Sequence, residues 1–313
     1  MIKVLVKSIG CEAKDIKTFE LVDASGSALP QFTAGAYVDV KLPGGLMRQY
    51  SLCNDPADTN RYLLAVFREA EGRGGSIAFH DKVAVGDQLN ISQPKNNFPL
   101  DHRFMNYTLI AGGIGVAPLL SMAYKLRSLS KEFNFHMCVQ SADQLPFKKE
   151  LEELVEHNRL QFHVSNGDPA RRLDVATLLA KPISAGVVYC CGPEGLINAV
   201  SEATTSWYSN TVRFELFKPE ELDGTDEEFD VKIASTGQVI KVGPKETILS
   251  ALWKAGIEKE FSCELGICGI CRTPFSEGVP IHRDDNVLSL KEREKELTIC
   301  VSRCKSPLLT IDI

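Results

Sequence analysis

The sequence predicts a multi-domain protein with an antiparallel β-barrel first, a doubly wound parallel α/β domain second and a smaller α+β domain last. The chain has 313 residues, which favours two or three domains over one. Short alternating runs fill the first third, whereas strands and helices alternate from Tyr107 onward. Residues 218–313 hold 13 Lys and Arg against 18 Asp and Glu, while residues 1–217 are nearly neutral, with 22 against 23.

The composition excludes several classes of protein. Hydrophobic residues make up 44% and charged residues 24% of the chain, which is typical of a globular protein. The net charge of −6 argues against a broad nucleic-acid surface, and no apolar run reaches the roughly 18 residues of a membrane helix. The first seven residues resemble a strand and not a signal peptide. We therefore expect a cytoplasmic protein that binds neither nucleic acid nor membrane.

Residues 1–102 are predicted to form the barrel. The alternating run Tyr37–Leu42 ends at Pro-Gly-Gly, and Tyr62–Phe67 ends before a glycine-rich stretch. Many short strands with frequent turns are typical of a small antiparallel barrel.

Residues 103–217 are predicted to form the doubly wound domain, because strands alternate with helices there. We expect strands at 107–111, 135–140, 160–164 and 186–190, and helices at 118–129, 147–156 and 174–180.

The polar stretch 218–228 contains Pro and Gly but no apolar periodicity, so we interpret it as a linker. An exposed loop inside one domain is the alternative. Residues 229–313 are then the last domain, with strands at 229–234, 239–242 and 308–313, a helix from about Thr247 and a long cysteine-bearing loop.

Four cysteines in the last domain suggest a metal centre. Cys263, Cys268 and Cys271 have the C-x4-C-x2-C spacing of plant-type [2Fe–2S] ligation, and a fourth cysteine follows later. Cys300 and Cys304 compete for that fourth position. Zinc is the alternative metal, but its usual paired C-x2-C spacing is absent. Four clustered cysteines in an untargeted chain favour metal over disulfides.

A glycine-rich turn between a strand and a helix suggests a dinucleotide site. Gly112, Gly113 and Gly115 allow a tight turn and close approach of the backbone to a pyrophosphate, and Pro118 suits the first position of the helix. A purely structural glycine turn is the alternative. Asp143 follows the second strand and could bind the ribose hydroxyls. No Arg in that turn could receive a 2′-phosphate, which favours NADH over NADPH.

A second glycine cluster, Gly74-Gly75-Ser76, follows the strand that ends at Arg68. Glycine amides, a serine hydroxyl and nearby guanidinium groups, among them that of Arg68, suit the phosphate group of a cofactor. A solvated hairpin loop would have the same composition.

The run Arg48-Gln-Tyr50-Ser51-Leu52 carries groups that a flavin requires: a cation, an aromatic surface and a hydrogen-bonding hydroxyl. Strict alternation places Arg48 and Tyr50 on one face and Ser51 on the other.

In these motifs and their order, the sequence resembles the ferredoxin–NADP reductase superfamily, in the phthalate dioxygenase reductase branch, which ends in a plant-type ferredoxin. The matching segments are Arg-Gln-Tyr-Ser-Leu-Cys-Asn-Asp-Pro (48–56), Gly-Arg-Gly-Gly-Ser (72–76), Ala-Gly-Gly-Ile-Gly-x-x-Pro (111–118), Tyr-Cys-Cys-Gly-Pro (189–193), Phe-Glu-x-Phe (214–217), the cysteine loop, His-Arg-Asp (282–284) and Cys-Val-Ser-Arg (300–303). The resemblance covers essentially the whole chain.

The resemblance implies a flavin-binding barrel, an NAD-binding α/β domain and a β-grasp ferredoxin domain. It implies FMN, with its phosphate at Gly74–Ser76 and its ring on Arg48, Tyr50 and Ser51. It further implies that Cys191, Gly192 and Pro193 border the nicotinamide, that Phe217 packs near the flavin ring, and that Cys300 is the fourth iron ligand. Ser51, Cys191 and Phe217 are thus the expected catalytic residues. For Cys191, a redox thiol paired with Cys190 remains the alternative to a packing thiol.

Two positions depart from the family pattern. Gln140-Ser141 replaces a Thr-Arg or Ser-Arg pair, and Cys304 replaces an Ala.

Together these features lead us to expect the NADH-dependent reductase of a two-component Rieske oxygenase, which passes electrons from NADH through FMN and [2Fe–2S] to a separate protein. A reductase for a demethylase or cytochrome is the alternative enzyme. A redox-sensing module that does not oxidise NADH rapidly is the alternative outside enzymes.

Overall fold

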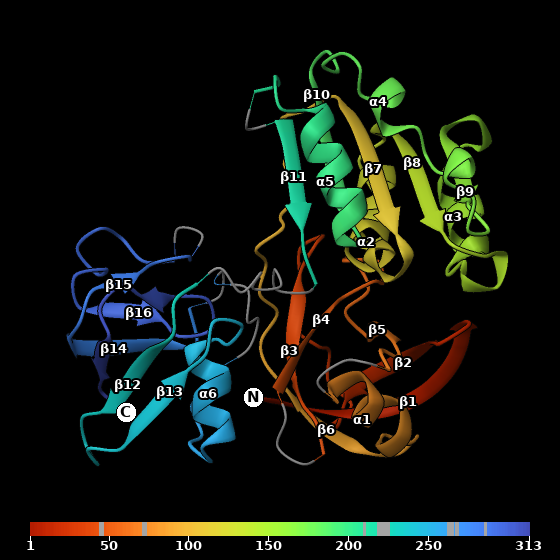
Figure 1. Ribbon diagram of the computed structural model, residues 1–313. Helices are drawn as coiled ribbons and strands as arrows, with labels where there is room; N and C mark the ends of the chain where they lie inside the picture. Colours follow the sequence, from red (N-terminus) through yellow and green to blue (C-terminus); the bar gives the residue numbers. More distant parts are fainter. Residues whose placement is uncertain are drawn as a thin grey trace. The chain divides into compact units, whose positions relative to one another are not determined.

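The structure, a computed structural model, describes residues 1–43, 47–70, 74–208, 211–217, 226–261, 266, 269–284 and 287–313. The chain divides into two units, Met1–Phe217 and Lys218–Ile313. The first unit contains an antiparallel sheet and a parallel sheet, and the second contains a mixed sheet (Figure 1).

The antiparallel sheet has six strands in the order β4-β3-β6-β1-β2-β5. Its strands are β1 (Ile2–Ala13), β2 (Ile16–Asp23), β3 (Tyr37–Lys41), β4 (Met47–Ser51), β5 (Tyr62–Phe67) and β6 (Gln88–Ile91). A bridge between Leu52 and Leu64 joins the two edges, so the sheet closes into the expected barrel.

One helix of the barrel unit, α1 (Gly75–Lys82), was not predicted. It begins directly after Gly74, whose φ of 78° lies in the left-handed region that favours glycine. Lys82 lies in its last turn, where a cation complements the helix dipole. The glycine cluster 74–76 is therefore a helix start and not a hairpin loop.

The parallel sheet has five strands in the order β11-β10-β7-β8-β9. They are β7 (Asn106–Gly112), β8 (Glu132–Val139), β9 (Leu160–Val164), β10 (Gly186–Cys191) and β11 (Val212–Glu215). The helices are α2 (Val116–Ser128), α3 (Lys148–Leu154), α4 (Val175–Leu178) and α5 (Glu194–Ala203), with short 3-10 turns η1 (Gly113–Gly115), η2 (Ala142–Gln144), η3 (His157–Arg159) and η4 (Pro169–Arg171). The sequence patterns predicted neither α5 nor β11.

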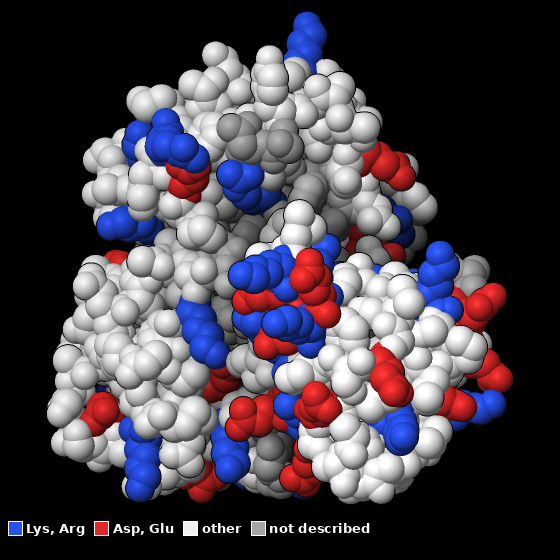
Figure 2. All heavy atoms as spheres, turned by 90° about the vertical axis from the view of Figure 1, so that its left-hand side faces the viewer, with Lys and Arg blue, Asp and Glu red and all other residues white. Residues whose placement is uncertain are grey.

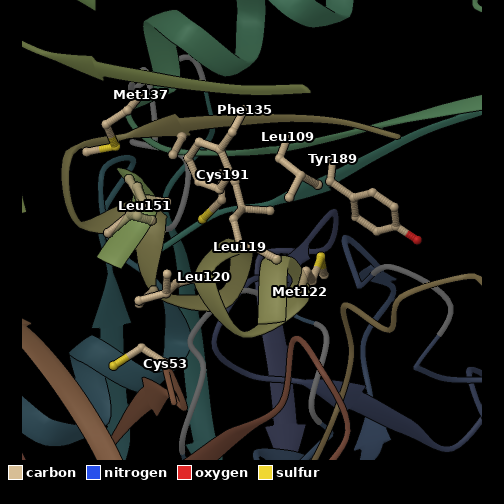
Figure 3. Packing of buried hydrophobic residues seen from close by; sticks show 14 of the residues in the cluster. Cys53, Leu109, Leu119, Leu120, Met122, Phe135, Met137, Leu151, Tyr189 and Cys191 are labelled. Atoms are coloured by element: carbon tan, nitrogen blue, oxygen red, sulfur yellow. The ribbon is translucent and has the colours of Figure 1, made fainter. Parts of the chain in front are cut away.

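Helices cover both faces of this sheet. Leu109 and Phe135 pack with α2 and α3 in one core, whereas Ile110 and Val188 pack with α4 and α5 in another. The first core continues into the barrel through residues such as Cys53 (Figure 3). The barrel and the parallel sheet therefore share a hydrophobic core.

One local prediction for α2 was wrong. Pro118 was expected at the first helical position, but the helix begins at Val116, so Pro118 occupies the third. Proline is tolerated there because the amides of the first turn have no partners within the helix.

The second unit has a five-stranded sheet in the order β13-β12-β18-β14-β16, in which β12 and β18 pair in parallel. Its elements are β12 (Phe229–Ile233), β13 (Val239–Val242), α6 (Ile248–Lys254), β14 (Arg272–Glu277), β15 (Pro280–Ile281), β16 (Glu296–Thr298), β17 (Arg303–Cys304) and β18 (Leu308–Ile311). Thr247 and Ser250 form a capping box that fixes the start of α6.

Within the described part of the chain, no helix has the length and hydrophobicity needed to cross a bilayer.

Candidate functional site: a glycine turn, a barrel strand and a cysteine loop

The Arg48 side chain and the start of α1 lie together at one corner of the barrel. A Cβ placed on Gly75 would lie 2.7 Å from Cγ and 2.8 Å from Nε of Arg48, so the arginine side chain runs directly over the first turn of the helix. Burial lowers the pKa of Arg48 from its usual value, but the group stays cationic at neutral pH. A guanidinium beside the unpaired amides of a helix N-terminus fits one phosphate group. The flavin phosphate expected at Gly74–Ser76 fits this corner.

Tyr50 and Ser51 extend the same strand. The Tyr50 ring packs edge-on against Phe79 of α1, with ring centroids 4.9 Å apart. Ser51 is buried at the end of β4, opposite Tyr37. An aromatic ring and a buried hydroxyl beside the phosphate corner provide the kinds of group that a flavin ring contacts.

Two other predicted flavin residues lie elsewhere. The Leu52 side chain is fully buried in the barrel core, so only its backbone could contact a ligand. The Arg68 guanidinium donates to Asp81 of α1 at 2.9 Å, in the part of the helix furthest from Gly75. Ser76 Oγ accepts a hydrogen bond from the Glu69 amide at 3.1 Å.

The parallel sheet has a topological switch point between β7 and β10, where the chain reverses its direction of travel across the sheet. From β7 the chain proceeds to β8 and β9, and then returns to β10 on the other side of β7. Ligands of open α/β folds bind at the carboxyl ends of the strands at such a switch point. The turn after β7 carries Gly112, Gly113 and Gly115, and the turn after β10 carries Gly192 and Pro193.

These two turns are packed so closely that no side chain fits between them. A Cβ on Gly115 would lie 2.2 Å from the carbonyl oxygen of Cys191, and one on Gly112 would lie 2.5 Å from Cδ of Pro193. A Cβ on Gly192 would lie 2.9 Å from Cα of Gly112. The glycine turn therefore presents bare backbone at the switch point, which fits a pyrophosphate. Its η1 turn also packs against β5 of the barrel.

Cys191 is fully buried at the end of β10, beside a residue that the motifs did not single out, Glu215. The Cys191 thiol donates to Glu215 Oε2 at 4.0 Å, because the two residues are paired across β10 and β11. Burial raises the pKa of Glu215 to about 8, and burial together with Glu215 raises that of Cys191 well above its usual value. At neutral pH the pair is therefore mostly uncharged.

This environment supports a packing role for Cys191 over a redox one. A reactive thiol needs its thiolate form, which burial disfavours here. Cys190 packs in the core on the opposite face of the sheet from Cys191. The pattern of the sequence could have suggested Glu215, since it lies inside the quoted Phe-Glu-x-Phe segment. Phe217, two residues further on, is 40% exposed, and its contact with a flavin stays a prediction.

The cysteine loop is described only in part, because Cys263 and Cys268 lie outside the described residues. Cys271 and Cys300 are each 2% exposed in one core cluster, and the Ile299 amide donates to the carbonyl oxygen of Cys271 at 3.5 Å. Cys304 Sγ instead lies 3.1 Å from Ser306 Oγ and 3.4 Å from the carbonyl oxygen of Val279. Neighbouring buried thiols at Cys271 and Cys300 fit the chemistry of a [2Fe–2S] donor set.

The His-Arg-Asp segment orders the same loop. The buried Asp284 accepts from the Leu288 amide at 3.0 Å and from Arg293 at 3.1 Å. A Cβ on Gly266, whose φ is 70°, would lie 3.1 Å from Cα of Asp284. Arg283 pairs with Asp226. Ion pairs and hydrogen bonds of Arg283 and Asp284 thus hold this segment in place.

Two family models match the parts of the chain that carry the glycine turn and the cysteine loop. Residues 109–202 match an oxidoreductase NAD-binding domain, and residues 231–305 match a 2Fe–2S iron–sulfur cluster binding domain. The chain is 39% identical to phthalate dioxygenase reductase of Burkholderia cepacia, over 96% of this chain and 94% of that protein. It is 38% identical to vanillate O-demethylase oxidoreductase of Pseudomonas sp. (strain HR199 / DSM 7063), over the whole of both chains.

A solved structure titled as phthalate dioxygenase reductase, a modular structure for electron transfer from pyridine nucleotides to [2Fe–2S], is also similar. It matches 100% of this chain and 98% of its own, with a TM-score of 0.78 and 38% sequence identity. This full-length similarity agrees with the barrel, the glycine turn of the parallel sheet and the cysteine loop. The chain therefore belongs to the phthalate dioxygenase reductase family of NAD-dependent flavin and iron–sulfur oxidoreductases.

Proposed function

We propose that the chain is the NADH-dependent reductase component of a two-component Rieske-type aromatic-ring oxygenase, delivering electrons through FMN and [2Fe–2S] to a separate oxygenase. The observation that supports this most is the combination of three features in one chain: a bare glycine turn at the switch point of the parallel sheet, an arginine over a helix start on the barrel, and the buried Cys271 and Cys300 of the cysteine loop. Flavin accepts an electron pair as hydride and releases single electrons, which [2Fe–2S] carries.

The residues of the chain have distinct tasks in this proposal. Arg48 and the first turn of α1 bind the flavin phosphate, while Tyr50 and Ser51 lie along its ring. The glycine turn after β7 binds the pyrophosphate of NADH. Because Glu215 is mostly protonated, the surroundings of the buried Cys191 carry little charge, which suits the transfer of a hydride between two rings nearby.

The second unit carries an excess of negative charge. Residues 218–313 carry 13 basic against 18 acidic residues. Figure 2 shows Lys and Arg side chains intermingled with Asp and Glu on one face of the molecule. We therefore propose that the excess negative charge of the second unit steers a partner that presents positive charge, and that oxygenase-coupled turnover falls with salt while NADH-to-dye activity does not.

One anaerobic experiment tests the core of this function. NADH is added stepwise to the purified protein while absorption and electron paramagnetic resonance spectra are recorded, and the released flavin is identified by chromatography. We expect released FMN, reduction of the flavin by NADH and the signal of a reduced [2Fe–2S] cluster. A chain that keeps an oxidised flavin with excess NADH would contradict the proposal.

A second acceptor is supported by the near-equal identity to a vanillate O-demethylase oxidoreductase and to a phthalate dioxygenase reductase. The reductase would then serve an O-demethylase. Coupled assays with purified oxygenases of each kind separate the two, because only the true partner should consume substrate in proportion to NADH.

We further propose a cytoplasmic location. Cys53, Cys190 and Cys304 are buried thiols without disulfide partners, which is the usual state in a reducing compartment.

A further inference from the structure

The tip of the β1–β2 hairpin reaches from the barrel to the loop that follows β8 (Figure 1). The Lys14 amide donates to the carbonyl oxygen of Asp143 at 2.8 Å, and Lys14 Nζ lies 3.7 Å from Asp143 Oδ2. At the other end of the loop, the Phe147 amide donates to Glu12 Oε1 at 2.8 Å. Two residues of one hairpin thus hold both ends of the segment 143–147.

This segment lies on the side of the switch point where the adenosine half of a bound dinucleotide would extend. It follows the carboxyl end of β8, which pairs directly with β7 and its glycine turn. A dinucleotide whose pyrophosphate sits on the turn after β7 extends its adenosine half toward the end of β8. Ser141 Oγ donates to Asp143 there, and this bond and Lys14 lower the pKa of the Asp143 carboxyl. The position of Asp143 therefore bears on ribose recognition.

Glu12 is the acceptor that fixes the end of this segment. Phe147 has a φ of 53°, a conformation that a non-glycine residue rarely adopts, and its ring is 1% exposed in the core shared with the barrel. The Phe147 amide donates its hydrogen bond to the Glu12 carboxylate, which is itself partly buried. Without that acceptor, a partly buried amide in a strained turn would lose its partner, and the turn would be free to relax.

We infer that Glu12 is a positioning residue for the adenosine half of NADH, so that the hairpin of the flavin barrel is part of the nucleotide site. The inference rests on the proposed use of NADH. Glu12 touches neither substrate nor cofactor in this account; it acts through Phe147 and the loop that carries Asp143.

The test compares Glu12→Ala, Glu12→Gln and a control, Glu20→Ala, in the whole protein loaded with flavin and cluster. Glu20 lies on the same hairpin, but its polar partners Lys7, Ser8 and Arg61 all belong to the barrel. Steady-state reduction of ferricyanide gives kcat and KM for NADH, and ADP-ribose serves as a competitive inhibitor that probes the adenosine half alone.

We expect Glu12→Ala to raise KM for NADH and Ki for ADP-ribose in parallel, each about tenfold, as the loss of a hydrogen bond to a charged group predicts. The kcat at saturating NADH should stay within about twofold. Glu12→Gln keeps an acceptor oxygen and should restore both constants, and Glu20→Ala should change neither.

Unchanged Ki for ADP-ribose in a folded Glu12→Ala protein with normal flavin content would overturn the inference, as would equal defects in the Ala and Gln variants. A fall in kcat and flavin content without a change in Ki would assign Glu12 a role in folding only and overturn it too. A wild-type protein that does not oxidise NADH would instead contradict the proposed function.

Discussion

Replacing Gly115 with alanine tests whether the close packing of the two turns forms the nucleotide site. The new Cβ would lie 2.2 Å from the carbonyl oxygen and 2.5 Å from the carbonyl carbon of Cys191. A carbon–oxygen contact needs roughly 3.3 Å, so the turns must separate by about 1 Å. The opposing group is backbone and cannot rotate away. A misplacement of about 1 Å at a binding site costs about 100-fold in rate.

We therefore expect kcat/KM for NADH to fall about 100-fold, close to 2.7 kcal/mol of transition-state stabilisation. The assay is NADH-dependent ferricyanide reduction, with flavin content and cluster absorption measured on the same sample. Gly195→Ala is the matched control, because a Cβ on Gly195 in α5 meets nothing within 4 Å. A Gly115→Ala protein within threefold of wild type, with normal flavin content, would refute the reasoning.

Three further predictions concern the other sites. Arg48→Gln should weaken FMN binding at least tenfold, because a charged hydrogen-bond donor to the phosphate is lost; equilibrium dialysis of FMN against the apoprotein measures this, and unchanged affinity would exclude the corner at Gly75. Cys300→Ser should abolish the cluster spectrum while NADH-to-ferricyanide activity persists, and Cys304→Ser should keep the cluster; the reverse result would make Cys304 the ligand. Burial and the adjacent His163 lower the pKa of His136 to about 4. Its neutral form stabilises the folded state above about pH 6.5, and this stability is lost as pH falls toward 4, by roughly 2 kcal/mol at pH 5. Urea unfolding at pH 5 and 7 measures the difference in free energy of unfolding between the two pH values, which should be smaller for His136→Gln than for the wild type. An unchanged difference for His136→Gln, or a reduced one for the exposed control His157→Gln, would contradict the assignment.

Local patterns predicted most elements of the nucleotide domain. The strand 160–164 is observed with the same bounds, because its alternation of apolar and polar residues is a local pattern that depends little on distant contacts. The helix α1 was missed, since its start is a glycine cluster that suggests a loop. The short strand β11 is defined by pairing with β10, which lies far away in the sequence.

For the candidate site, too, local sequence patterns predicted some features and tertiary packing determined others. The phosphate corner was expected from its residues, but the path of Arg48 over Gly75 follows from packing of α1 on the barrel. Leu52 was expected at the flavin, yet its side chain faces the barrel core, because the Leu52–Leu64 bridge that closes the barrel fixes its orientation.

The sequence by itself determined which chemical groups the protein has: cysteines at iron–sulfur spacing, a glycine turn between strand and helix, and a strand carrying Arg48, Tyr50 and Ser51. These signals are local, since each arises from residues a few positions apart. Only the tertiary structure brought Gly115 against Cys191, Glu215 beside the Cys191 thiol, and Glu12 to the amide of Phe147. Such contacts depend on strand order and on the core that the barrel shares with the parallel sheet, and no local periodicity encodes either.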